Sequence, residues 1–220
     1  MELKGKKINF LGDSITEGCG TSDISKGFVA LIGREEGLAA ARNYGIGGTR
    51  IARQTYPSEN PVWDQDFSSR VEAMDPDADV VVVFGGTNDY GHGDAPIGRM
   101  EDRTVWTFYG ALHVLYAGLI ERFPNALIVV LTPIHCEDET NPSGELPYKR
   151  AATAPLIEYV KIIRQVAEYY ALPVLDLYAT SGIQPNLPII KERFCPDGLH
   201  PNDEGNRLLA QRISAFLKTL

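Results

Sequence analysis

The chain has 220 residues, of which 44% are hydrophobic, and its formal net charge is -8 at pH 7. That length can bury one sizeable core, and because no repeat, low-complexity tract or Ser/Gly-rich linker divides it, we expect a single domain over residues 1–220. The acidic balance disfavours nucleic acid and anionic lipid surfaces as partners, since both bind basic faces.

The N-terminal residues run directly into a predicted strand, with no apolar signal segment before it. No apolar stretch approaches the length of a membrane span, so stable membrane insertion is not expected. The three cysteines are odd in number and widely separated, which is typical of a reducing cytosol rather than a disulfide framework. We therefore expect a cytoplasmic protein; its oligomeric state is left open by the sequence.

Predicted strands and helices alternate along the chain. Strands are predicted at residues 7–11, 40–44, 79–84, 126–131 and 172–177. Apolar residues recur at helical spacing in three segments, namely Val105-Phe108-Leu112-Leu115-Leu119, Leu156-Val160-Ile163-Ala167 and Leu208-Leu209-Ile213-Phe216-Leu217. This alternation predicts a three-layer α/β/α fold with a five-stranded parallel sheet in the flavodoxin-like order 2-1-3-4-5.

A serine follows the first predicted strand at a sharp turn. In the segment Phe-Leu-Gly-Asp-Ser-Ile-Thr-Glu-Gly, Gly12 permits the turn and Ser14 falls in the first turn of the next helix. Free backbone N–H groups of a helix start point toward such a position, and the hydroxyl is exposed there. Ser14 is therefore a candidate nucleophile, although Asp13 and Ser14 also fit an ordinary turn in which they cap backbone groups.

An aspartate and a histidine share one loop before the C-terminal helix, in Asp197-Gly198-Leu199-His200. Acyl transfer needs an imidazole that takes the serine proton and a carboxylate that orients the imidazole, so Asp197 and His200 are candidate partners of Ser14. For this loop alone the other interpretation stays open, in which Asp197 begins a turn and His200 precedes a helix capped by Asn202.

Two glycine-rich segments follow predicted strands. They are Asn43-Tyr44-Gly45-Ile46-Gly47-Gly48 and Gly85-Gly86-Thr87-Asn88-Asp89. Backbone N–H groups of a glycine turn and an Asn amide are suitable donors for an oxyanion, which makes Gly48 and Asn88 candidates. In the sheet order 2-1-3-4-5 the ends of strands one and three flank the switch point, so Ser14 and Asn88 are expected to face each other.

Together, Gly12-Asp13-Ser14, Gly48, Gly86-Thr87-Asn88-Asp89 and Asp197-Gly198-Leu199-His200 resemble the SGNH hydrolases, the GDSL-type esterases and lipases, and they appear in that family's order. The resemblance implies Ser14 as nucleophile and first oxyanion donor, Gly48 and Asn88 as the other donors, and Asp197 with His200 completing the triad. The first block reads Gly-Asp-Ser-Ile rather than Gly-Asp-Ser-Leu, an isomeric apolar change that should leave the turn intact.

Long polar loops at the same edge are expected to shape specificity. Tyr90, His92 and Asp94 follow Asn88, with Trp106 and Tyr109 behind them, and His135 begins a polar loop that extends to about Arg150. Of these, Tyr90, His92 and His135, with Asp13, are candidate substrate-binding residues. An aromatic and polar rim suits a sugar ester better than a long lipid.

The expected function is hydrolysis of small-molecule carboxylic esters through an acyl-enzyme, with short-chain or acetyl esters such as acetylated carbohydrates as substrates. A lysophospholipase or thioesterase of the same fold remains an alternative. So does a flavodoxin-like binding module, although it leaves Asp197, His200 and Asn88 without a role and places Glu17 against a phosphate. No compact metal motif is present, and no metal or cofactor is expected.

Overall fold

The computed structural model describes residues 1–140 and 154–220. Its five strands form one parallel sheet in the order β2-β1-β3-β4-β5, and this confirms the predicted 2-1-3-4-5 order. Because parallel strands all end at one edge, the loops that follow them gather there. The strands are β1 (Lys7–Gly12), β2 (Ala40–Gly45), β3 (Val80–Phe84), β4 (Leu127–Leu131) and β5 (Val174–Leu175).

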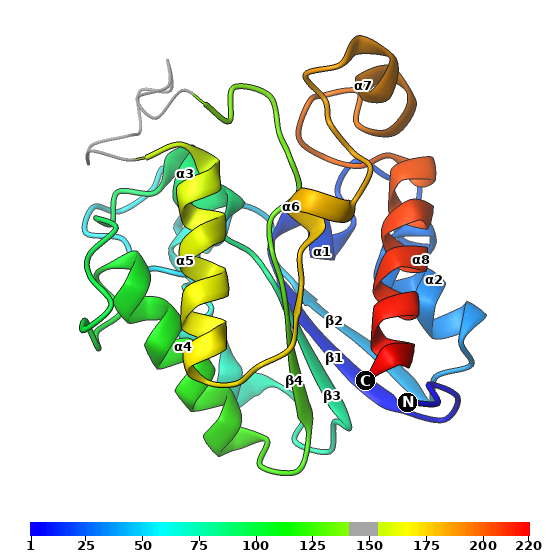
Figure 1. The fold of residues 1–220 in the computed structure, drawn as a ribbon, viewed down its shortest axis with the longest axis horizontal. Coiled ribbons are helices and arrows are strands. Elements are labelled where there is room, and N and C mark those ends of the chain that lie inside the picture. The colour runs from blue at the N-terminus through cyan, green and yellow to red at the C-terminus, as the bar shows by residue number, and fades with distance from the viewer. Residues whose placement is uncertain (141–153) are drawn as a thin grey trace.

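Helices cover both faces of the sheet (Figure 1). The described helices are α1 (Ser14–Glu17), α2 (Phe28–Glu35), α3 (Thr87–His92), α4 (Phe108–Arg122), α5 (Leu156–Tyr169), α6 (Leu177–Thr180), α7 (Pro188–Phe194) and α8 (Asp203–Thr219). Short 3-10 helices are η1 (Ile24–Lys26), η2 (Pro61–Asp64) and η3 (Ser68–Ala73). The three-layer α/β/α architecture predicted from the alternating pattern is thus confirmed.

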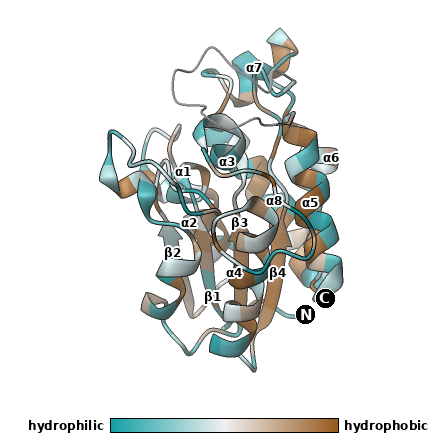
Figure 2. Cartoon of the chain, turned by 90° about the vertical axis from the view of Figure 1, so that its left-hand side faces the viewer, coloured by the Kyte–Doolittle hydropathy of each residue, from teal (hydrophilic) through white to brown (hydrophobic). Residues whose placement is uncertain are grey.

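The core is divided in two by the sheet. In β3, Val81 and Val83 pack with α4 and α5, while Val80 and Val82 pack with α2 and α8. Every residue of β3 is buried, as expected for a central parallel strand covered on both sides. Figure 2 shows the corresponding pattern, with hydrophobic central strands and hydrophilic residues on the covering helices.

The predicted helical segments are present, with one boundary displaced. Helix α4 begins at Phe108, because Thr107 caps it by accepting a hydrogen bond from the Gly110 N–H at 3.1 Å, and Val105 therefore precedes the helix. In α8, the Asn202 side chain accepts from the N–H groups of the first turn, which confirms the predicted cap.

The last strand is shorter than the predicted 172–177. Pro173 has no N–H to donate, although its carbonyl accepts a hydrogen bond from Val130. Asp176 accepts a hydrogen bond from the Ala179 N–H at 3.2 Å and so starts α6. The chain consequently leaves the sheet after Leu175.

The edge at which the strands end carries α1, α3 and the segment that follows β2, and the loop between α7 and α8 reaches them. The polar loop predicted to extend to about Arg150 falls largely on residues 141–153, outside the described residues. In the described ranges, no helix combines the length and apolar character that crossing a bilayer requires.

Candidate active site

Ser14 lies where β1 gives way to α1. Asp13 is the N-cap, and its carboxylate accepts the Ile15 N–H at 3.0 Å. Ser14 is the first helical residue, so its own N–H has no partner within the helix. A Cβ at Gly12 would overlap the Thr16 side chain, so glycine permits the strand end to lie against this turn. The turn thus places a hydroxyl beside a donor N–H, as predicted.

The structure brings Ser14, His200 and Asp197 together in a continuous chain of hydrogen bonds. Ser14 Oγ lies 3.0 Å from His200 Nε2, and His200 Nδ1 lies 2.7 Å from Asp197 Oδ2. A carboxylate accepts only, so Nδ1 carries the proton and Nε2 is left to accept the serine proton. The backbone N–H groups of Leu199 and His200 also donate to Asp197, at 2.9 and 2.7 Å.

The electrostatics of this loop keep Asp197 ionised. Partial burial acts to raise the pKa of its carboxyl, but the N–H groups of His200 and Leu199 and the imidazole together lower the pKa below its usual range. A carboxylate in that state can stabilise a positive charge on the imidazole.

The two remaining candidate donors lie next to each other. Asn88, in the first turn of α3, donates through Nδ2 to the Thr49 carbonyl at 3.0 Å. Thr49 follows Gly48 directly, so the amide of Asn88 is tied to the segment that carries the Gly48 N–H. Gly48 has a φ of 74°, a left-handed conformation that favours glycine.

Trp63 packs onto Gly48. A Cβ at Gly48 would overlap indole atoms Cδ1, Nε1 and Cγ, so the Trp63 ring occupies the space that a side chain would take. Its ring centroid also lies 5.2 Å from that of His92. No sequence pattern marks Trp63, because contact between η2 and the loop after β2 depends on loop conformation.

Arg70 is a second residue that sequence reasoning missed. Its guanidinium donates to the carbonyls of Tyr44 and Gly12 at 2.7 and 3.1 Å and to Thr49 Oγ1 at 3.1 Å. It thereby joins the ends of β2 and β1 to the loop that carries Gly48. Burial lowers its pKa to about 10, so the side chain stays cationic at neutral pH.

Two carboxylates are buried behind the candidate site. Burial raises the pKa of Asp13 to about 6, against the opposing effects of the Ile15 N–H, His200 and Arg70. Burial likewise raises the pKa of Asp89 to about 6, and the charge of Asp89 contributes to the raised pKa of Asp13. Both are ionised at neutral pH only at a cost in stability.

The candidate substrate-binding residues lie in different surroundings. Tyr90 is 5% exposed, and its hydroxyl donates to the Asp138 carbonyl, so it belongs to the core side of α3. The His92 carbonyl accepts from Arg50 at 3.0 Å. The His135 Nδ1 lies 2.8 Å from Glu139 Oε2, and its ring centroid lies 3.8 Å from that of Tyr178, with the two ring planes tilted by 36°.

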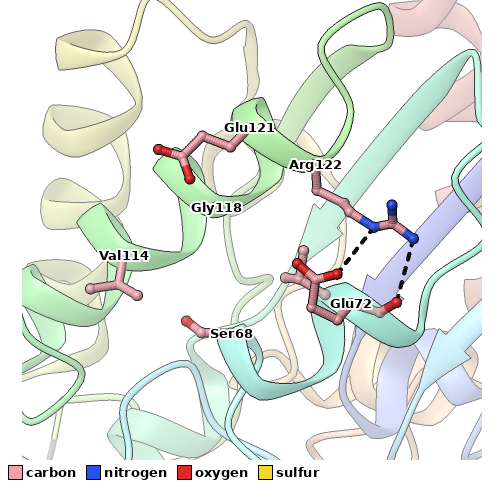
Figure 3. Close-up of a pocket in the computed structure, with 7 residues that line it drawn as sticks. Ser68, Glu72, Val114, Gly118, Glu121 and Arg122 are labelled. Carbon is pink, nitrogen blue, oxygen red and sulfur yellow. Dashed lines mark hydrogen bonds and ion pairs between the residues drawn. The ribbon is translucent and has the colours of Figure 1, made fainter.

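A hollow of about 370 Å³ lies elsewhere, between η3 and α4 (Figure 3). An ion pair of 3.6 Å between Arg122 and Glu72 bridges its wall. Its lining includes Ser68, but neither a histidine nor any candidate site residue, so it does not have the parts of a hydrolytic site.

Other nucleophiles and metal ligands are poorly placed. The Cys195 thiol is buried, and burial raises its pKa to about 12, which keeps it protonated. Across residues 1–140 and 154–220, no group of at least three His, Cys, Asp and Glu side chains is arranged to hold a metal ion.

Fold and site together define the SGNH class of hydrolases: a parallel sheet in the order 2-1-3-4-5, with the four characteristic segments collected at its edge. The GDSL-like lipase/acylhydrolase family matches residues 10–208. The chain therefore belongs to that family, and the predicted resemblance is confirmed.

Known relatives agree with this assignment. A GDSL lipase of Mycobacterium tuberculosis is 26% identical over 225 residues, covering 99% of this chain and 84% of the relative. A crystal structure of a Lactobacillus plantarum protein is 29% identical with a TM-score of 0.82, covering 98% of each chain. An acetyl xylan esterase structure shares the fold, with 24% identity, a TM-score of 0.63, and coverage of 95% of this chain and 98% of that one.

Proposed function

We propose that this protein is a serine esterase that hydrolyses carboxylic esters of short acyl groups through an acyl-enzyme on Ser14. The observation that carries the proposal is the hydrogen-bonded chain from Ser14 through His200 to Asp197, with distances of 3.0 and 2.7 Å. Membership of a family of lipases and acylhydrolases supports ester hydrolysis as the reaction class.

In the acylation step, His200 Nε2 takes the Ser14 proton as Oγ forms a bond to the ester carbonyl carbon. The carbonyl oxygen becomes an oxyanion, for which the N–H groups of Ser14 and Gly48 and the Asn88 amide are the proposed donors. The imidazolium is stabilised by Asp197 at 2.7 Å and then gives its proton to the departing alcohol oxygen.

Deacylation repeats this sequence with water. His200 takes a proton from the water as its oxygen attacks the acyl carbon, and the bond to Ser14 Oγ breaks as the imidazolium returns a proton to Oγ. The carboxylic acid leaves and the starting hydrogen bonds are restored.

The preference for short acyl groups rests on Trp63. Its indole fills the space beside Gly48, a proposed oxyanion donor, and this leaves less room for a long chain next to the reacting carbonyl. The aromatic and imidazole rings of Trp63, His92, His135 and Tyr178 near this edge are suited to stack on a sugar. Acetylated carbohydrates, including acetylated xylan, are therefore substrates to test.

The proposal is tested with p-nitrophenyl esters from acetate to palmitate, using the wild type and Ser14→Ala. We expect the wild type to hydrolyse the acetate or butyrate ester fastest. In Ser14→Ala this activity should be lost, and kcat should fall by roughly a factor of a million, as in comparable triads. A long-chain optimum would favour the lysophospholipase or thioesterase alternative. Equal rates in the two proteins would refute the serine mechanism.

A further inference from the structure

The two oxyanion donors other than Ser14 come from separate segments of the chain. Asn88 lies in α3, whereas Gly48 lies in the loop between β2 and η2. An oxyanion hole works only if its donors are held in fixed positions before charge develops. Contacts must therefore hold the Gly48 loop against α3, and two of them are hydrogen bonds: Asn88 donates to the Thr49 carbonyl, and the Arg50 side chain donates to the His92 carbonyl.

Asp89 supplies a further contact from the position next to Asn88. One oxygen of its carboxylate accepts the Ile51 N–H at 2.9 Å, and the other accepts the Ala52 N–H at 2.8 Å. The side chain is 4% exposed, so water does not compete for these bonds. The two carboxylate oxygens thus accept hydrogen bonds from two consecutive residues of the loop that carries Gly48.

The hydrogen bonds of Asn88 and Asp89 bracket the same short segment. Asn88 bonds to the Thr49 carbonyl, and Asp89 accepts from the N–H groups of Ile51 and Ala52. The Arg50 side chain also donates to the His92 carbonyl at the end of α3, so each of residues 49–52 has a hydrogen bond to this helix. A carboxylate can accept both N–H groups at once, whereas an amide of the same shape has one acceptor oxygen. The identity of the residue as Asp, rather than its size, therefore determines whether the Ile51 and Ala52 N–H groups are both bonded to α3.

We propose that Asp89 is a positioning residue of the oxyanion hole, which fixes the Gly48 N–H relative to the Asn88 amide by holding residues 51 and 52. It does not touch the substrate. The inference rests on the proposed esterase function, and it adds the residue that sets the distance between two of the three donors.

The first test compares Asp89→Asn with a matched control, Asp79→Asn. Asp79 also accepts a backbone N–H, that of Lys7 at 2.8 Å, but at the start of β3, at the opposite edge of the sheet. We expect Asp89→Asn to lower kcat for p-nitrophenyl acetate by about 10- to 100-fold with KM within about threefold, as for a misplaced catalytic group. Asp79→Asn should leave both constants near those of the wild type.

A double-mutant cycle with Asn88→Ala distinguishes an effect on the position of the oxyanion donors from a general loss of native structure. If Asp89 acts through the oxyanion hole, Asp89→Asn should cost at least about threefold less in kcat when Asn88 is already Ala than in the wild type. Equal costs in the two backgrounds would overturn the inference, as would a loss that appears only in KM.

Hydrogen exchange at Thr49 provides a measurement that needs no activity. The Thr49 N–H donates to the Ile46 carbonyl at 3.3 Å and does not touch Asp89, so its exchange rate reports the order of the loop. We expect exchange to be about tenfold faster or more in Asp89→Asn and unchanged in Asp79→Asn. Unchanged exchange at Thr49 in Asp89→Asn would refute the positioning role, even if Ser14-dependent esterase activity were found. Faster exchange in Asp89→Asn, together with a wild type that has no esterase activity, would refute only the proposed function.

Discussion

Replacing Asp13 by Asn should stabilise the protein at neutral pH and have a smaller effect in acid. Asn retains an oxygen for the Ile15 N–H, which Asp13 accepts at 3.0 Å, and remains a good N-cap for α1. What the substitution removes is a buried charge. The side chain is 2% exposed, and burial raises the pKa of the carboxyl from 3.8 to about 6.

The magnitude follows from that shift. A pKa raised by roughly two units corresponds to about 3 kcal/mol, at 1.36 kcal/mol per unit. Below about pH 4 the carboxyl is protonated in both the folded and the unfolded state, so the charge imposes no penalty. Between about pH 4 and pH 6 the unfolded state ionises first and the native state loses relative stability, and above about pH 6 the whole penalty is present.

Urea unfolding of the wild type and Asp13→Asn between about pH 4.5 and about pH 8, an interval that includes the raised pKa of about 6, measures the effect. We expect the free energy of unfolding of Asp13→Asn, minus that of the wild type, to rise by roughly 2 kcal/mol across this interval, because part of the penalty is already present at its acid end. Because the charge of Asp89 contributes to the raised pKa of Asp13, the pH-dependent gain from Asp13→Asn should be smaller in an Asp89→Asn background. A difference that stays constant with pH would refute the reasoning.

Three other predictions concern the site. Asp197→Asn should lower kcat by roughly 10⁴-fold, because the imidazole loses the acceptor at 2.7 Å that sets its tautomer; a loss below about tenfold in steady-state kinetics would contradict this. Trp63→Ala should move the chain-length optimum toward longer p-nitrophenyl esters, whereas Trp63→Phe should keep most of the short-chain preference; unaltered profiles in both would remove Trp63 from the acyl pocket. Gly48→Ala should destabilise the protein by about 1–3 kcal/mol in urea, since φ is 74° and the added methyl overlaps Trp63; wild-type stability would show that the loop accommodates a side chain.

Much of the fold could be predicted because its signals are local. The apolar run of β3 and the helical spacing of Leu112, Leu115 and Leu119 depend on neighbouring residues alone, and the structure places them as expected. Strand β5 ends earlier than its sequence pattern predicts, because the Asp176 side chain caps α6 instead of continuing the strand.

The candidate site could be located because its residues lie at the ends of recognisable strands or before a helix. Ser14 and Asn88 follow β1 and β3, and the loop with Asp197 and His200 precedes α8, so the parallel topology alone predicts their meeting.

The surroundings of the site could not be predicted in the same way. Tyr90 was expected at the rim, but in α3 it faces the core, which a short Gly-rich segment does not reveal. Arg70 and Trp63 reach the Gly48 loop from segments without a regular pattern. Long-range contacts of this kind depend on loop conformation, and composition carries little information about it.

The central claim is that Ser14 carries the acyl group, and mass spectrometry of protein quenched during turnover of p-nitrophenyl acetate tests it most directly. We predict an acetyl group on the tryptic peptide that spans residues 8–26, assigned to Ser14 by fragmentation and absent from Ser14→Ala. The acyl-enzyme can also be sought in His200→Ala incubated with the same ester at high concentration, because loss of the base slows deacylation. Ester hydrolysis that proceeds with no adduct on Ser14, and equally well in Ser14→Ala, would contradict the account.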